Sequence, residues 1–308
     1  MSPWRTGAAT GVGSLPGTDP LEAAKLVLGE LAIPHLPELP QRGHLADLAG
    51  RGAALLADLH VDVQPTGWRF VPRPSREGRR ARDLLQQDVD ALELAAHGAH
   101  PEHLKLQATG PWTLAAIIEL HRGDKALADH QAVADIAQSL AQGLQDYVAD
   151  VQRRFPHTTI HLQLDEPSLN GVLHAGIPTA SGFATLRAPD RQTVREHLRT
   201  ALSAHDSTVL HCCARRPPIN LLKEAGAISV DAAMLDPRDD DALGEALEQG
   251  TGLLLGVPKD VKAALQTVGR MRDRVGVRDV TLTPPCGLAF DPDPLATLQA
   301  LTKAAGEL

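Results

Sequence analysis

A histidine and a cysteine two positions apart, His211 and Cys213, give the clearest chemical signal in this 308-residue sequence. They end an apolar run typical of a buried strand, and side chains alternate along a strand, so both should point the same way. Cys212 would then point into the packing layer. Imidazole and thiolate are good zinc ligands, and carboxylates such as that of Asp231 also serve. On spacing alone, buried apolar cysteines beside a hydrogen-bonded core histidine are an equal alternative.

Cys286 favours the metal interpretation. The prolines before it and Gly287 after it indicate irregular backbone at the end of a strand, not core. The sequence contains neither a C-x-x-C pair nor an H-E-x-x-H helix, so the spacing signal is of moderate strength.

An acidic pair, Asp165 and Glu166, ends another apolar run. It could bind a substrate ammonium group or act as acid and base. The alternative is a helix cap plus a surface carboxylate. We favour the functional interpretation, because buried charges are rare unless they are paired or used. Ser14 and Glu38 also follow apolar runs and could fix a small polar ligand.

Eight short apolar runs, each followed by a helical segment, must position these side chains. Continuous apolar runs are typical of parallel strands buried on both faces. Eight such units favour an α/β fold, a single-domain (β/α)8 TIM barrel over residues 1–308, with its active site at the carboxyl ends of the strands. A doubly wound open sheet is the alternative. The predicted strands are 8–13, 31–36, 104–108, 158–164, 207–212, 227–230, 252–255 and 279–282.

Capping residues place several helices. Asp19 can cap a helix with Pro20 at its first position and Glu22 completing a capping box, and Asp293 can cap the last helix. A hairpin-like insertion is predicted over residues 61–71. Further helices are predicted at 44–59, 83–96, 113–121, 127–155, 190–204, 219–225, 240–249, 261–275 and 293–305.

Two other patterns carry weaker signals. Gly11, Gly13 and Gly17 do not match a dinucleotide-binding loop, because the spacing is G-x-G-x-x-x-G and Pro16 would sit inside the turn. We expect a small ligand to approach this backbone closely instead. The arginine-rich stretch 69–82 is interpreted as a solvated loop and helix start, with contact to an anionic substrate tail or partner as the alternative.

Composition excludes several classes of protein. The formal net charge of −8 disfavours nucleic-acid binding, which depends on phosphate neutralisation. Three cysteines do not make a secreted disulfide framework. Residues 1–13 lack a signal-peptide apolar region, and no apolar run approaches the ~18 residues of a membrane span. We therefore expect a cytoplasmic protein without membrane contact.

Six segments, in order along the chain, resemble motifs of the cobalamin-independent methionine synthase family. Residues 12–16 resemble its strand-one motif, and 110–113 resemble its Gly-Pro-x-Thr turn. Residues 164–167 resemble its Ile-Asp-Glu-Pro motif, and 211–213 its His-x-Cys zinc motif. Residues 228–231 resemble a segment ending in a glutamate ligand, and 283–288 the segment with the last cysteine ligand. The barrels of this family are similar to those of uroporphyrinogen decarboxylases.

The resemblance implies a zinc-dependent methyltransferase of methionine biosynthesis. In the family, the homocysteine thiol joins the zinc, loses its proton and attacks a methyl group. A free thiol, with a pKa near ~8.5, is mostly protonated at neutral pH, and zinc coordination deprotonates it. The implied zinc ligands are His211, Cys213, Asp231 and Cys286.

The resemblance also implies the partners of the site. The homocysteine amino group would lie near Asp165, the implied catalytic residue, and Glu38, and its carboxylate near Ser14. This chain departs from the long enzymes of the family in having one barrel and no histidine in residues 256–260. The methyl donor is therefore either methyl-tetrahydrofolate or a methyl-corrinoid, the latter with a corrinoid protein as partner.

Two further classes of function compete with this one. The first is a related barrel enzyme that alkylates another thiol, or one of the uroporphyrinogen decarboxylase type, which needs no zinc. The second is a non-catalytic zinc-holding protein, which would keep a closed four-ligand site.

Overall fold

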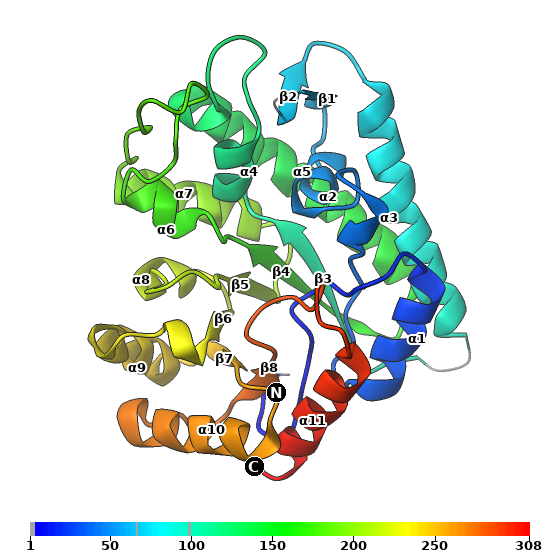
Figure 1. Ribbon diagram of the computed structural model, residues 1–308, viewed down its shortest axis with the longest axis vertical. Helices are drawn as coiled ribbons and strands as arrows, with labels where there is room; N and C mark the ends of the chain where they lie inside the picture. The colour runs from blue at the N-terminus through cyan, green and yellow to red at the C-terminus, as the bar shows by residue number, and fades with distance from the viewer. Residues whose placement is uncertain (1–3, 66, 98–99) are drawn as a thin grey trace.

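A curled parallel sheet with helices around its outside forms the centre of the computed structural model, which describes residues 4–65, 67–97 and 100–308 (Figure 1). Six strands pair in sequence order, and every neighbouring pair is parallel. The α/β prediction is therefore confirmed. The strands are β3 (His103–Thr109), β4 (Thr159–Asp165), β5 (Thr208–His211), β6 (Ala227–Asp231), β7 (Gly252–Gly256) and β8 (Thr281–Thr283).

The first two predicted strands, 8–13 and 31–36, do not form regular strands. They run extended between β8 and β3 and make only isolated bridges, Ala9 with Leu282 and His35 with Lys105. The segments also contact each other, because Ile33 N–H donates to the Ala9 carbonyl at 3.1 Å. Pro34 lacks a backbone donor, which interrupts a regular ladder. The eight-strand prediction thus holds for six strands.

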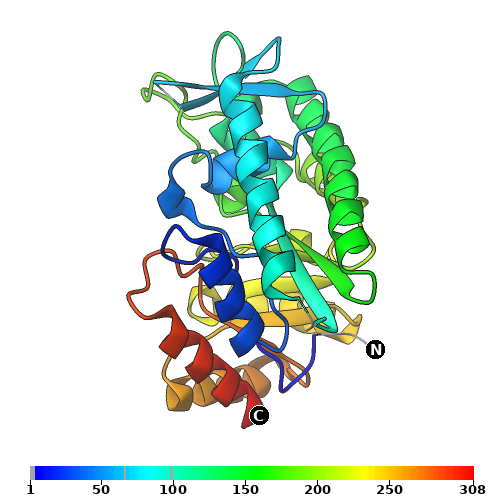
Figure 2. The same ribbon diagram turned by 90° about the vertical axis from the view of Figure 1, so that its right-hand side faces the viewer.

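Helices lie against the outer face of the sheet in both views (Figures 1 and 2). The predicted cap Asp19 is confirmed, since its carboxylate accepts from the N–H groups of Leu21 and Glu22. The Glu22 side chain binds Lys25 instead of completing a capping box. The longer helices are α1 (Pro20–Glu30), α3 (Arg76–Ala95), α5 (His130–Arg154), α7 (Arg191–Leu202), α9 (Asp240–Glu248), α10 (Val261–Val275) and α11 (Pro294–Gly306).

The region before β3 differs most from the prediction. The hairpin is confirmed as antiparallel β1 (His60–Gln64) and β2 (Gly67–Val71), which lies apart from the main sheet at the top of Figure 1. The helix predicted over 44–59 shrinks to α2 (Leu48–Ala54), and α3 starts earlier than predicted because Ser75 caps it. Other short helices are α4 (Pro111–Ile117), α6 (Leu169–Leu173), which was not predicted, and α8 (Ile219–Leu222).

Strands β3 and β4 are apolar on one face and polar on the other. Leu104, Leu106, Leu162 and Leu164 are fully buried members of the main apolar core. The alternate residues are polar and point to the other face. Among the helices that the structure describes, none is long and apolar enough to cross a membrane.

Candidate active site

Three predicted metal ligands come together at the carboxyl end of the sheet. His211 ends β5, Cys213 follows two residues later, and Cys286 lies in the loop after β8. Hydrogen bonds from the side chains of Cys213 and His211 lower the pKa of the Cys286 thiol to about 4. The same contact with Cys286, together with burial, raises the pKa of Cys213. Cys212 is fully buried in the core, as predicted.

A hydrogen bond fixes the His211 ring. Its Nδ1 lies 2.9 Å from Ser229 Oγ on β6, which leaves Nε2 for a partner in the site. Metal-binding histidines are commonly oriented by such a bond on the other ring nitrogen.

Asp231, the fourth predicted ligand, ends β6 beside this group. Its charge interacts with Cys286 and His211, and burial raises its pKa. One carboxylate oxygen accepts from the Ala233 N–H at 2.9 Å and so caps the next turn. Asp231 therefore lies close to Cys286, with one of its carboxylate oxygens already bound to backbone.

The donor set suits a metal ion by its chemistry more than by its present geometry. Within the described ranges, no three His, Cys, Asp or Glu side chains already stand in a metal-binding arrangement. A thiol in contact with a second thiol and an imidazole nevertheless has the chemistry of a zinc site. The thiol hydrogen bond would have to give way to metal bonds.

Asp165 and Glu166, predicted as one acidic pair, point to different places. Asp165 lies on the polar face and accepts from Gln163 Nε2 at 2.7 Å. Burial raises its pKa to about 7, while the nearby His211 and Lys105 oppose that shift. Glu166 is fully buried and accepts from the N–H groups of Trp112 and Thr113 at 3.0 and 2.8 Å. Glu166 thus caps the start of α4, as the alternative interpretation expected, but neither carboxylate lies on the surface.

Ser14 and Glu38 lie beside each other in the two extended segments and share a parallel bridge. The Ser14 carbonyl accepts from the Leu288 N–H at 2.7 Å, which ties it to the loop of Cys286. A Cβ added to Gly287 would lie 2.0 Å from Ser14 Oγ, so the Ser14 side chain lies directly against this glycine. Ser14 is therefore adjacent to the cysteine loop.

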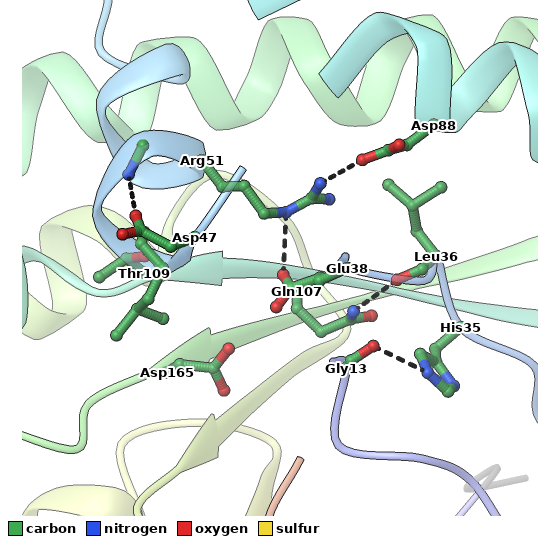
Figure 3. Close-up of polar contacts among 12 residues, drawn as sticks. Gly13, His35, Leu36, Glu38, Asp47, Arg51, Asp88, Gln107, Thr109 and Asp165 are labelled. Carbon is green, nitrogen blue, oxygen red and sulfur yellow. Dashed lines mark hydrogen bonds and ion pairs between the residues drawn. The ribbon is translucent and has the colours of Figure 1, made fainter. Parts of the chain in front are cut away.

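Glu38 is held by an internal arginine (Figure 3). Arg51 Nε donates to Glu38 Oε1 at 3.2 Å, and the same guanidinium pairs with Asp88 on α3. All three side chains are buried. Figure 3 shows the carboxylates of Glu38 and Asp165 turned toward the same interior region as Gln107. Glu38 is consequently a paired carboxylate, whereas Asp165 has no such arginine.

A buried lysine completes the polar face. Lys105 Nζ donates to the Val12 carbonyl at 3.0 Å and to Gln163 Oε1 at 2.8 Å, and Gln163 in turn donates to Asp165. Gln107 Nε2 donates to the Leu36 carbonyl at 2.7 Å, while its Oε1 has no partner among the described residues. Sequence analysis missed these residues. Their signal is the polar-apolar alternation within strands that were interpreted as continuously apolar.

The close approach of a small ligand to the N-terminal glycines stays a prediction, but at Gly11 and Gly13 other side chains already lie close. A Cβ on Gly11 would lie 2.2 Å from His35 Cε1, and one on Gly13 would lie 2.9 Å from Gln107 Nε2. At these two glycines the close approach comes from the chain's own side chains. In the arginine-rich stretch 69–82, Arg69 pairs with Glu119.

Solved structures share this fold. No protein-family model and no curated protein matches the chain. A B12-independent methionine synthase from Shewanella sp. W3-18-1, solved with selenomethionine, matches with a TM-score of 0.63 and 11% identity, over 98% of this chain and 96% of that one. A methyltransferase from Methanosarcina mazei matches with a TM-score of 0.60 and 17% identity, over 98% and 94%. The chain therefore has a methionine synthase-like fold.

Proposed function

We propose that this chain is a zinc-dependent methyltransferase that moves a methyl group to the thiol of homocysteine and releases methionine. The observation that carries the proposal is the contact of Cys286 with both His211 and Cys213, at the end of the sheet where Asp165 also lies. Two structures with this fold are a methionine synthase and a methyltransferase, which supports a methyl-transfer reaction.

His211, Cys213 and Cys286 would hold the zinc, with Asp231 as the fourth protein ligand. When bound, zinc would keep the substrate thiol deprotonated at neutral pH and therefore nucleophilic. The Ser229 contact holds the His211 ring in place, so the side chain needs little reorganisation to bind. Holding the thiolate in line with the methyl donor would lower the remaining barrier.

Asp165 would bind the homocysteine ammonium group. Its Oδ1 already accepts a hydrogen bond from Gln163, so the carboxylate is oriented before substrate arrives. Glu38 would add negative charge near Asp165, while Arg51 binds one of its carboxylate oxygens. Ser14, next to the cysteine loop, would meet the substrate carboxylate. The methyl donor would be methyl-tetrahydrofolate or a methyl-corrinoid, the second delivered by a partner protein.

Zinc content and X-ray absorption at the zinc edge test this proposal. We expect one zinc per chain, whose shell gains one sulfur when homocysteine is added. A protein prepared without chelators that holds no stoichiometric zinc, or zinc that ignores homocysteine, would reject the proposal. The decarboxylase-like or zinc-holding alternatives would then stand.

The three cysteines provide a matched set of variants. Cys213→Ser and Cys286→Ser should each abolish stoichiometric zinc, because a thiolate ligand is lost. Cys212→Ala should keep it, because that thiol is buried in the core. Equal zinc content in all three variants would contradict the assignment of ligands.

A further inference from the structure

A cavity rich in arginine lies outside the proposed catalytic group. It has a volume of about 460 Å³, and four arginines line it: Arg191, Arg215, Arg216 and Arg238. Its walls come from α6, from the first residue of α7, from the loop between β5 and α8, and from the turn before α9. Figure 1 shows these four helices along one side of the sheet.

The backbone of the loop in this cavity is held in place. Asn170 Nδ2 on α6 donates to the Arg215 carbonyl at 3.0 Å, and the Arg216 N–H donates to the Met234 carbonyl at 2.9 Å. Arg216 adopts a φ of 54°, in the left-handed region that side chains other than glycine rarely occupy. Such strain persists only where surrounding contacts impose it, and it concentrates at functional sites.

The nearby carboxylates are engaged with backbone, and Asp236 Oδ1 also lies 3.7 Å from Arg238 Nε. Asp236 and Asp239 form a reciprocal capping box, in which each side chain accepts from a backbone N–H of that turn. The Arg238 N–H and the charges of Arg238, Arg216 and Arg215 lower the pKa of Asp236, so these three arginines lie around that carboxylate. Within the described ranges, the guanidinium groups of Arg191, Arg215 and Arg216 make neither a hydrogen bond nor an ion pair. The cationic charge of the cavity exceeds the acidic charge around it.

We propose that this cavity binds a small polyanion that presents two or more anionic groups, either phosphates or carboxylates. Guanidinium groups bind both through two parallel N–H···O bonds. The volume exceeds the need of a single inorganic phosphate and fits a ligand with several groups. The proposal goes beyond methyl transfer and holds whether or not the chain has that activity.

Isothermal titration calorimetry on the full chain tests this, with pyrophosphate and tricarballylate as separate probes at physiological ionic strength. We expect one of the two to bind at one site per chain. The preferred probe then tells phosphate from carboxylate ligands. Arg215→Gln with Arg216→Gln should weaken that binding by about tenfold or more. The matched control, Arg80→Gln with Arg122→Gln, removes two arginines that are equally exposed but lie elsewhere, and should weaken it less than about threefold.

Three results would overturn the proposal. The first is that wild-type protein binds neither probe. The second is that the control loses as much affinity as the double variant, which would make the binding a general charge effect. The third is full affinity in the double variant. If the double variant melts at a lower temperature than wild type, Arg215→Gln alone provides the comparison.

Discussion

Lys105 is the residue that most constrains the candidate site. It is fully buried, and its direct hydrogen-bond partners are a carbonyl and an amide oxygen, not a carboxylate. Burial lowers its pKa, while the charges of Asp165 and Glu38 oppose that shift. By accepting from Lys105, Gln163 Oε1 forces the amide nitrogen toward Asp165. Lys105 is thus placed to orient the Asp165 carboxylate, the proposed ammonium-binding group, through Gln163.

Lys105→Met should raise the KM for homocysteine about tenfold, because a charge-assisted hydrogen bond that orients Asp165 is lost. Steady-state kinetics give KM and kcat, and kcat should change less. A thiol acid without the amino group should show no such difference between variant and wild type. Lys25→Met, at an exposed lysine of α1, is the control. An unchanged KM in Lys105→Met would show that the lysine only fills space.

At the scale of the element, Glu166 ties α4 to the end of β4. It accepts three hydrogen bonds at the start of the helix, so replacing it leaves buried donors without a partner. Burial raises its pKa to about 7, against an ordinary value of 4.5, although these bonds oppose the shift. The folded protein therefore binds this proton more tightly than the unfolded chain.

The sign of the pH effect follows from this shift. The stability contributed by the proton on Glu166 is present below about pH 4.5 and is lost as the pH rises to about 7. The glutamine of Glu166→Gln cannot ionise. As the pH rises from about 4.5 to about 7, the free energy of unfolding of the wild type should therefore fall relative to that of the variant. Urea denaturation at several pH values measures it. Glu248→Gln, at an exposed position, is the control, and its free energy of unfolding should differ from that of wild type by the same amount at every pH. The same constant difference for Glu166→Gln would refute the raised pKa of Glu166.

The extended segment at residues 8–13 depends on glycine for its packing against His35. Gly11→Ala should destabilise the protein by about 1–3 kcal/mol, because the new Cβ would overlap the buried imidazole. Thermal or denaturant melting measures this. Gly29→Ala in α1 meets no atom within 4 Å and should stabilise by up to ~1 kcal/mol through helix propensity. Similar effects for both would show that the segment tolerates the methyl group.

The elements were predictable where local pattern and tertiary packing agree. The strands from β3 to β8 lie within about two residues of their predicted ends, because each is an apolar run between turns. Segments 8–13 and 31–36 were overestimated, since their pairing is with distant strands and Pro34 limits it. The positions of His211, Cys213 and Cys286 at strand ends followed from the sequence. The contacts of Arg51 and Lys105 did not, because they join segments that no local pattern relates.

At the scale of the molecule, the cysteine group joins β5 to the loop after β8. A ligand that binds only the folded state stabilises it by mass action, by about 4 kcal/mol at a thousandfold excess over its Kd. Zinc should therefore raise the melting temperature of the metal-free protein by several degrees in differential scanning calorimetry. Cys286→Ser should lose that gain, and Cys212→Ala should keep it. A gain that survives in Cys286→Ser would place the zinc elsewhere.

The contacts between β8 and the first extended segment, residues 8–13, have a consequence for synthesis on the ribosome. Thr6 donates to the carbonyl of Arg278, a separation of 272 residues, and Ala9 pairs with Leu282. These contacts cannot form until β8 has left the exit tunnel. Until then the nascent chain carries an open ring, and its two edges, β7 and the segment 8–13, have unpaired backbone groups, which are targets for intermolecular pairing. The last step of folding is therefore a closure, and chaperone contact should be needed most just before it.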